Sequence, residues 1–140
     1  MSKYILVKQT EENDCGLACF NMLLLQNCEN INLDDLKKVC NYKNNKMTFF
    51  DLHNLANRLC YYSAAYYVND IKEITFNFLP CIAQIKITNG MLHFVVLFTK
   101  CKNYFLMGDP AKKMRYIHID FFHKQFTGYI FKIKKISPKV

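Results

Sequence analysis

Hydrophobic and polar positions follow a helical period in the first part of the chain. Residues 15–27 are apolar on nearly all sides, which predicts a buried central helix. Asn32, followed by two acidic residues, predicts the capped start of a short helix that ends near Val39. A third helix is predicted to open at residues 48–51. Its apolar stripe has the spacing i, i+3, i+4, i+7 and consists of Leu52, Leu55, Ala56 and Leu59.

The period changes after residue 60, where short apolar and aromatic runs alternate with turn sequences. The predicted strands are residues 61–68, 81–87, 93–98, 104–107, 114–119 and 129–136. One helical turn is predicted at residues 70–74 and a short helix at 120–126, and Thr88-Asn89-Gly90 is typical of a hairpin turn. Helices first and an antiparallel sheet second predict an α+β fold.

The start of the first helix carries a candidate nucleophile. Cys15 lies where a turn gives way to the apolar helix, and the unpaired N–H groups and positive dipole end of a helix start favour a thiolate. Gly16 has no side chain, and we expect it to leave the thiol open to a peptide. Gln9 lies six residues upstream, where its uncharged amide is a candidate donor to an oxyanion.

The predicted sheet supplies a candidate base and a candidate carboxylate. His93 opens a Val-rich apolar strand, which would fix the orientation of its ring. Asp109 follows another strand in a Gly-Asp-Pro turn, and that strand is expected to lie beside the His93 strand. Asp109 is therefore a candidate to accept the imidazole N–H, although Gly-Asp-Pro is also an ordinary turn sequence. The competing histidines lie on a helix face or in surface-like segments: His53, His118 and His123.

Composition excludes several other classes of protein. The chain has seven cysteines without paired CxxC spacing, which argues against a disulfide scaffold and against a zinc site. Cys15 and Cys19 are four residues apart, but two thiols alone are a weak metal site, and no metal or cofactor is predicted. The other six cysteines are expected to be reduced and mostly buried: Cys19, Cys28, Cys40, Cys60, Cys81 and Cys101. The net charge is +8, but no segment has a nucleic-acid recognition pattern, so no nucleic-acid partner is predicted.

Length and hydropathy predict one soluble domain. The 140 residues suit a single unit, and 51% hydrophobic content indicates a packed core. The longest uncharged stretch, residues 15–28, is shorter than the roughly 18 residues that a membrane span needs. The N-terminus has only four consecutive apolar residues, which is too few for a signal peptide.

Three motifs together resemble the double-glycine leader peptidase family, the papain-like N-terminal domains of bacteriocin-exporting ABC transporters. They are QTEENDCGLAC at residues 9–19, HFVVL at 93–97 and the Asp-Pro turn at 109–110. The resemblance extends from Gln9 to about Phe131. It implies a papain-like fold in which Cys15, His93 and Asp109 are catalytic and Gln9 serves the oxyanion hole.

The resemblance also implies a substrate, a location and partners. We expect residues 1–140 to be a single peptidase domain, the N-terminal part of a larger ABC exporter, on the cytoplasmic side of the cell membrane. Its substrate would be a precursor peptide cut after Gly-Gly or Gly-Ala, with the helical part of the leader in an apolar groove. Its other partners would be the membrane and ATPase parts of the exporter. The alternatives are a leader-binding module that has lost catalysis, which Cys15 argues against, and an acyltransferase that uses the same thioester chemistry.

Three positions depart from the pattern that is common in this family. Lys46 and Lys113 stand where glycine is frequent, and Phe126 stands where tryptophan is usual before Thr-Gly. We expect these departures to affect the substrate groove and not the catalytic residues.

Overall fold

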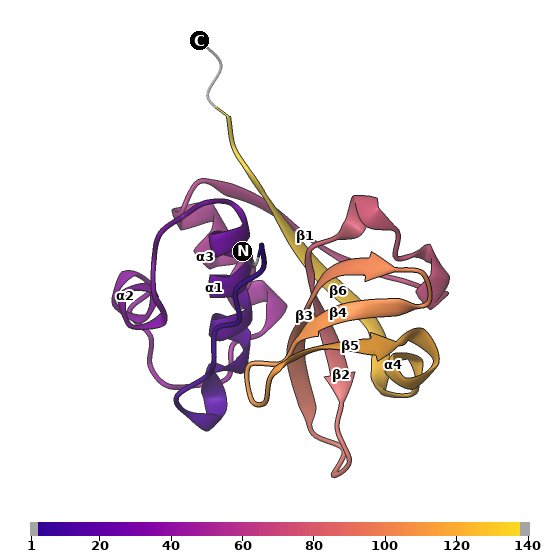
Figure 1. Ribbon diagram of the computed structural model, residues 1–140. Coiled ribbons are helices and arrows are strands. Elements are labelled where there is room, and N and C mark those ends of the chain that lie inside the picture. The colour runs from indigo at the N-terminus through magenta and orange to yellow at the C-terminus, as the bar shows by residue number, and fades with distance from the viewer. Residues whose placement is uncertain (1–2, 138–140) are drawn as a thin grey trace.

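The computed structural model describes residues 3–137 as helices followed by a sheet (Figure 1). The α-helices are α1 (Cys15–Gln26), α2 (Leu33–Val39), α3 (Phe49–Arg58) and α4 (Ile119–Gln125). The strands are β1 (Tyr61–Tyr67), β2 (Cys81–Lys86), β3 (Leu92–Cys101), β4 (Tyr104–Gly108), β5 (Met114–His118) and β6 (Phe126–Lys135). Single 3-10 turns form η1 (Glu12–Asp14), η2 (Ile71–Glu73) and η3 (Phe76–Phe78). The predicted α+β fold is confirmed.

The predicted helix starts are confirmed by their capping bonds. The Asn32 side chain accepts a hydrogen bond from the Asp35 N–H at 2.8 Å, which caps α2. At the start of α3, Thr48 and Asp51 form a capping box, in which each side chain accepts a bond from the backbone N–H of the other. α1 is buried along most of its length, as its apolar sequence predicts.

All strand pairs of the six-stranded sheet are antiparallel, in the order β1-β6-β2-β3-β4-β5. The tight connection between β2 and β3 is the expected hairpin turn, closed by a bond from the Gly90 N–H to the Ile87 carbonyl at 2.8 Å. Gly90 has φ +82°, a left-handed conformation that favours glycine. The β3–β4 pairing places the end of β4 beside the middle of β3, with Gly108 opposite Val96.

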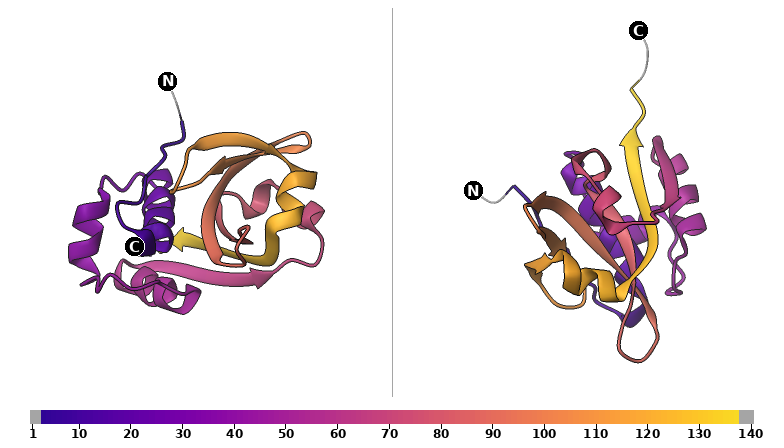
Figure 2. Two further views of the ribbon diagram at one scale, coloured as in Figure 1. Left: turned by 90° about the horizontal axis from the view of Figure 1, so that it is seen from below. Right: turned by 90° about the vertical axis from the view of Figure 1, so that its right-hand side faces the viewer.

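Two hydrophobic cores lie on opposite faces of the sheet. The helices α1 and α3 cover one face and α2 packs on the outer side of α1, whereas α4 lies at the other side of the strongly curved sheet (Figures 1 and 2). Alternate residues of one strand enter different cores, as period-2 strand geometry requires. In β3, Val96 belongs to the core beneath the helices, and Val95 belongs to the core that Phe122 of α4 closes.

Three predicted elements have wrong bounds. β3 continues to Cys101, three residues beyond its predicted end at residue 98. The last helix begins one residue earlier than expected, because the His118 side chain caps it by accepting a bond from the Asp120 N–H at 3.1 Å. β6 then starts at Phe126 and not at residue 129, and its first residue stacks on Phe122. The turn η3 was not predicted.

The expectation that the remaining cysteines are mostly buried was also wrong. Cys19 and Cys81 are buried, but Cys40 is half-buried, and Cys28, Cys60 and Cys101 are exposed. Cys28 and Cys60 have φ of 63° and 64°, and each follows the end of a helix. Such left-handed positions are common where a helix stops at the surface, so their exposure follows from the backbone and not from side-chain polarity. Within residues 3–137, no helix has the length and apolar character that crossing a membrane requires.

Candidate active site

Cys15 is the first residue of α1 and directly follows η1, so it lies at the helix start that the sequence predicts. Only 5% of the residue is exposed. The thiol forms hydrogen bonds with His93 and with the backbone of Phe94, both on β3. The helical layer and the sheet therefore meet at the sulfur atom.

Gly16 has a different role from the one expected. A Cβ atom at this position would lie 3.3 Å from the Phe94 ring and 3.4 Å from the Met47 carbonyl oxygen. Gly16 is buried. It packs against these neighbouring residues and does not border an open path to the thiol. The missing side chain allows α1 to pack closely against β3, which brings Cys15 to His93.

The His93 ring bridges the thiol and the carboxylate of Asp109. His93 Nε2 lies 2.8 Å from Asp109 Oδ1, and the other ring nitrogen is left for Cys15. Asp109 follows β4 and is 8% exposed. Its Oδ1 also accepts the Ala111 N–H at 2.9 Å, so the Asp-Pro turn fixes the carboxylate. The structure therefore brings together the three residues proposed as nucleophile, base and orienting acid.

The charges at this site favour a thiolate beside an imidazolium. Burial alone would raise the pKa of Cys15, but hydrogen bonds with His93 and Phe94 and the positive charges of His93 and Lys46 lower it. Burial alone would lower the pKa of His93, but hydrogen bonds to Asp109 and Cys15, and their charges, raise it to about 9. Burial opposes ionisation of Asp109 as well, yet the bonds from His93 and Ala111 lower its pKa.

Gln9 lines the cleft that contains Cys15, but its amide is engaged within its own loop. Gln9 Nε2 donates to the carbonyl oxygens of Glu11 at 3.2 Å and Glu12 at 3.4 Å. The Gln9 backbone N–H donates to the Pro110 carbonyl at 2.9 Å, which joins this loop to the turn that holds Asp109. The oxyanion role of Gln9 stays a prediction, and Gln9 lines the same cleft as Cys15.

The cleft has a volume of about 350 Å³ and is bordered by the start of α1, the β2–β3 hairpin and the β4–β5 turn. Its charged lining beyond the candidate residues consists of Glu12, Lys46, Lys112 and Arg115. Lys46, one of the departures from the family pattern, donates to the Leu92 carbonyl at 3.5 Å on the opposite wall. At Lys113, another departure, the backbone carbonyl accepts the Asp109 N–H at 3.0 Å, a contact that depends on no particular side chain.

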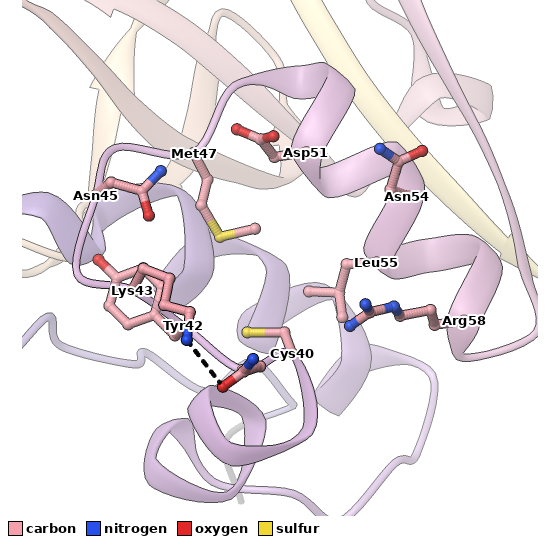
Figure 3. Close-up of a pocket in the computed structure, with 10 residues that line it drawn as sticks. Cys40, Tyr42, Lys43, Asn45, Met47, Asp51, Asn54, Leu55 and Arg58 are labelled. Atoms are coloured by element: carbon pink, nitrogen blue, oxygen red, sulfur yellow. Dashed lines mark hydrogen bonds between the residues drawn. The ribbon is translucent and has the colours of Figure 1, made fainter.

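A second cavity, between α2 and α3, lacks comparable chemistry (Figure 3). It contains the half-buried Cys40, whose pKa is raised by burial, in the opposite direction to that of Cys15. Asp51 and Arg58 of α3 line it, and Lys43 Nζ donates to Asn41 Oδ1 at 3.5 Å, but no histidine is among its lining residues. This cavity therefore does not compete for the role of active site.

The other histidines lie away from the cleft. His53 is on α3, where its Nδ1 contacts the Ser63 hydroxyl and its Nε2 lies 3.4 Å from Asn57 Nδ2. His53 therefore bonds to polar side chains of α3 and β1 and has no contact with Cys15. Among residues 3–137, the structure contains no group of three or more His, Cys, Asp or Glu side chains arranged to hold a metal ion.

Asp14 is a residue of the site that sequence reasoning missed. It is completely buried and directly precedes Cys15, and its Oδ2 lies 2.8 Å from Lys37 Nζ. An aspartate at a helix start is ordinarily interpreted as a solvent-exposed cap, and its partner is on another helix. The only available signal was its position next to the nucleophile.

This fold and this site, with a helix-start cysteine facing a histidine and an aspartate on an antiparallel sheet, are those of the papain-like cysteine peptidases. The model of the Peptidase C39 family matches residues 3–137. The chain therefore belongs to the Peptidase C39 family.

Curated relatives of this chain are much longer proteins. It is 30% identical over 123 residues to the colicin V secretion/processing ATP-binding protein CvaB of Escherichia coli, a match that covers 88% of this chain and 17% of CvaB. It is 28% identical over 141 residues to the sublancin-168-processing and transport ATP-binding protein SunT of Bacillus subtilis, covering 96% of this chain and 19% of SunT. The chain thus spans less than a fifth of the length of these relatives.

Solved structures confirm the fold. The peptidase domain of Streptococcus ComA, a bifunctional ABC transporter, superposes with a TM-score of 0.83 at 20% identity, covering 95% of this chain and 99% of that domain. A double-glycine-motif protease from an AMS/PCAT transporter, solved with its leader peptide, superposes with a TM-score of 0.79 at 23% identity over 95% and 92% of the two chains.

The charge pair predicts the pH dependence of Cys15 reactivity. Because the Cys15 pKa is lowered, iodoacetamide labelling of Cys15 should stay fast at pH values below the pKa of an ordinary thiol. Labelling should become slow only when acid protonates the thiolate.

Turnover should also fall as the pH rises through about 9, where His93 loses the proton that the leaving group needs. In Asp109→Asn the alkaline limb should move to lower pH, because the carboxylate that raises the His93 pKa is gone. Labelling rates and kcat/KM measured against pH check this, with the exposed Cys101 as internal reference; an unmoved alkaline limb contradicts it.

Proposed function

We propose that this domain is a cysteine endopeptidase that removes the leader from a secreted peptide precursor after a Gly-Gly or Gly-Ala site. The observation that carries the proposal is the position of His93, which contacts both the Cys15 thiol and Asp109 within one cleft. Membership of the Peptidase C39 family and likeness to a double-glycine protease solved with its leader support the substrate class.

The chemistry proceeds in two steps through a thioester. The Cys15 thiolate attacks the carbonyl carbon of the second leader glycine, and the imidazolium of His93 gives its proton to the leaving amine. Water, deprotonated by His93, then hydrolyses the thioester and releases the leader. Asp109 holds the imidazole and stabilises its charge throughout.

The developing oxyanion receives hydrogen bonds from the Cys15 backbone N–H and the Gln9 amide. Gln9 Nε2 carries two hydrogens, so one can stay on the Glu11 carbonyl while the other leaves its longer contact with Glu12. Each such donor contributes roughly 2.7–4 kcal/mol to the transition state.

The apolar part of the leader requires an exposed apolar surface, and the side of β1 that faces α3 offers one. Ser63 of β1 contacts His53 of α3, and Tyr67, four residues along the same strand, points to the same face. The Tyr67 ring lies 5.1 Å from that of Tyr129, both rings are about half exposed, and Phe50 of α3 is 71% exposed. We assign the apolar face of a leader helix to Phe50, Tyr67 and Tyr129.

A matched pair of tyrosine variants tests this surface. Tyr67→Ser should raise KM for a full leader peptide about 10-fold or more through loss of apolar contact, while kcat for the bound peptide stays near its original value. Tyr62 is exposed to a similar degree but points to the opposite face of β1, so Tyr62→Ser should leave KM unchanged. Equal effects of the two substitutions would contradict the assignment.

The proposed setting is supported by the relatives, whose names describe them as processing and transport ATP-binding proteins. The domain would act at the cytoplasmic side of the membrane, joined to the membrane and ATPase parts of an exporter. The function is tested by mixing the domain with a synthetic peptide that has an apolar helical leader, Gly-Gly and a short cargo. The masses of the products are then measured by mass spectrometry. Two fragments separated after the second glycine are expected. Transfer of the leader to an added amine in preference to water would identify an acyltransferase, and an uncut but bound peptide would identify a binding module.

A further inference from the structure

The buried carboxylate of Asp14 holds together the segment that leads into the nucleophile. None of Asp14 is exposed, and its Oδ2 accepts hydrogen bonds from Thr10 N at 3.1 Å, Thr10 Oγ1 at 2.8 Å and Glu11 N at 2.9 Å. These bonds close residues 10–14 into a compact loop. A buried carboxylate is stable only when it is paired and hydrogen-bonded. Here Oδ2 accepts all of these bonds, and the buried Oδ1 has no hydrogen-bond partner within residues 3–137.

The counter-charge comes from a different element of the fold. Lys37 of α2 places its Nζ 2.8 Å from Asp14 Oδ2 and 2.9 Å from Thr10 Oγ1, so it bonds to both ends of the loop. Lys37 Nζ also lies 5.6 Å from the ring centroid of Tyr42, which comes just after α2. The loop is thereby anchored to the helical layer independently of Cys15.

The same loop carries both proposed oxyanion donors. At one end it holds the Gln9 amide through the Glu11 and Glu12 carbonyls, and at the other end it continues into Cys15. The Gln9 backbone is also bonded to the Pro110 carbonyl, next to Asp109. The separation between the Gln9 amide and the Cys15 N–H therefore depends on the conformation of residues 9–15, and Asp14 makes the bonds that fix it.

We propose that Asp14, paired with Lys37, is a positioning residue that keeps the Gln9 amide and the Cys15 N–H aimed at one oxyanion. It touches neither the substrate nor the thiol, and it acts through the loop. The inference rests on the proposed peptidase function and assigns a role to a residue outside the Cys15–His93–Asp109 set. A residue that only contributes stability would not affect the contribution of Gln9.

The test is a double-mutant cycle between Asp14→Asn and Gln9→Ala on the intact domain, with a Gly-Gly leader peptide as substrate. Gln9→Ala alone should lower kcat by ~10²–10³-fold, the usual effect of removing one oxyanion donor. Asp14→Asn alone should lower kcat by about 10–100-fold through misplacement of the loop, with KM within about twofold of wild type. Gln9→Ala added to Asp14→Asn should then lower kcat by only about 10-fold, because the misplaced Gln9 amide already contributes less to the transition state. Additive effects would overturn the proposal while leaving the peptidase function intact.

Two further measurements separate positioning from a general loss of structure. Iodoacetamide labelling of Cys15 needs no oxyanion donor, so its rate and pH dependence should be unchanged in Asp14→Asn. Amide hydrogen exchange should become faster only in residues 9–15, and this readout does not depend on whether the peptide is cut. Exchange that is unchanged there, or faster throughout the sheet, would contradict the proposal.

Milder and matched variants keep the test decisive if Asp14→Asn folds poorly. Thr10→Val removes one bond to the carboxylate and leaves the Asp14–Lys37 pair in place, and it should show the same coupling to Gln9→Ala with a smaller fall in kcat. Asp34→Asn changes an exposed acid on the helix that carries Lys37, and it should show no coupling. Coupling of equal size for Thr10→Val and Asp34→Asn would overturn the assignment.

Discussion

Replacing Cys15 by alanine is expected to abolish leader cleavage while leaving leader binding intact. Without the thiol no thioester can form, and loss of a nucleophile ordinarily lowers turnover by at least ~10⁴-fold. The apolar surface proposed for the leader lies on α3, β1 and β6 and does not include Cys15, so affinity for the uncut peptide should change little. Product formation by mass spectrometry and binding by calorimetry measure the two effects on the same protein.

The control for this variant is another cysteine of the chain. Cys28→Ala changes an exposed thiol at the end of α1 and should leave turnover at the wild-type rate. Turnover in Cys15→Ala within about 10-fold of wild type would remove the nucleophile assignment, because catalysis without the nucleophile is far weaker. The three exposed cysteines also make labelling by mass necessary, since total thiol counts would not distinguish Cys15.

Changing either glycine before the scissile bond to valine is expected to lower kcat/KM for cleavage strongly, by about 10–200-fold at each position. The Cys15 residue is only 5% exposed, so the substrate backbone must approach very closely for its carbonyl carbon to reach the sulfur. A branched side chain at that depth collides with the cleft wall. Overpacking by a few methyl groups costs about 1–3 kcal/mol, which corresponds to a fall of about 10–200-fold in kcat/KM at each position.

Matched substrates separate this steric effect from a general loss of affinity. Valine placed just after the scissile bond should have little effect, and Gly-Ala should be cut better than Gly-Val because alanine adds a single methyl group. Comparison of kcat/KM across these five peptides separates the two effects. If Gly-Val were cut as well as Gly-Gly, the enzyme would be a cysteine peptidase of broader specificity.

The residues whose environment is set locally were predictable from the sequence. The start of α1 at Cys15 follows from an apolar run after a turn, and the placement of His93 beside the β4 end follows from the hairpin order of the strands. Both depend on short-range patterns that residue type and spacing report. The α+β fold was accessible for this reason. The meeting of Cys15 with His93 and Asp109 across the two layers was expected from the resemblance to the double-glycine leader peptidase family, because no local pattern connects these elements.

The features that escaped prediction depend on contacts between distant elements. Asp14 is buried because Lys37, on the next helix, neutralises it, and no spacing rule connects an N-cap aspartate with that lysine. Gly16 is required by the ring of Phe94, which lies on the sheet. The exposed Cys28 and Cys60 were missed because their surface position comes from a left-handed backbone at the end of a helix, whereas cysteine itself favours the interior.

The proposed catalytic pair is divided between the helical layer and the sheet. The turnover rate should therefore depend strongly on the position of one layer relative to the other. Cys15 moves with α1, whereas His93 and Asp109 move with β3 and the β4–β5 turn, and the close contact of Gly16 with Phe94 sets their spacing. A relative shift of about 1 Å is enough to reduce catalysis by ~10²-fold, far less motion than unfolding requires. On heating, the enzyme should consequently lose activity at a temperature at which its helices and strands are still intact. A ligand that binds between the two layers and separates them would inhibit the enzyme without entering the cleft.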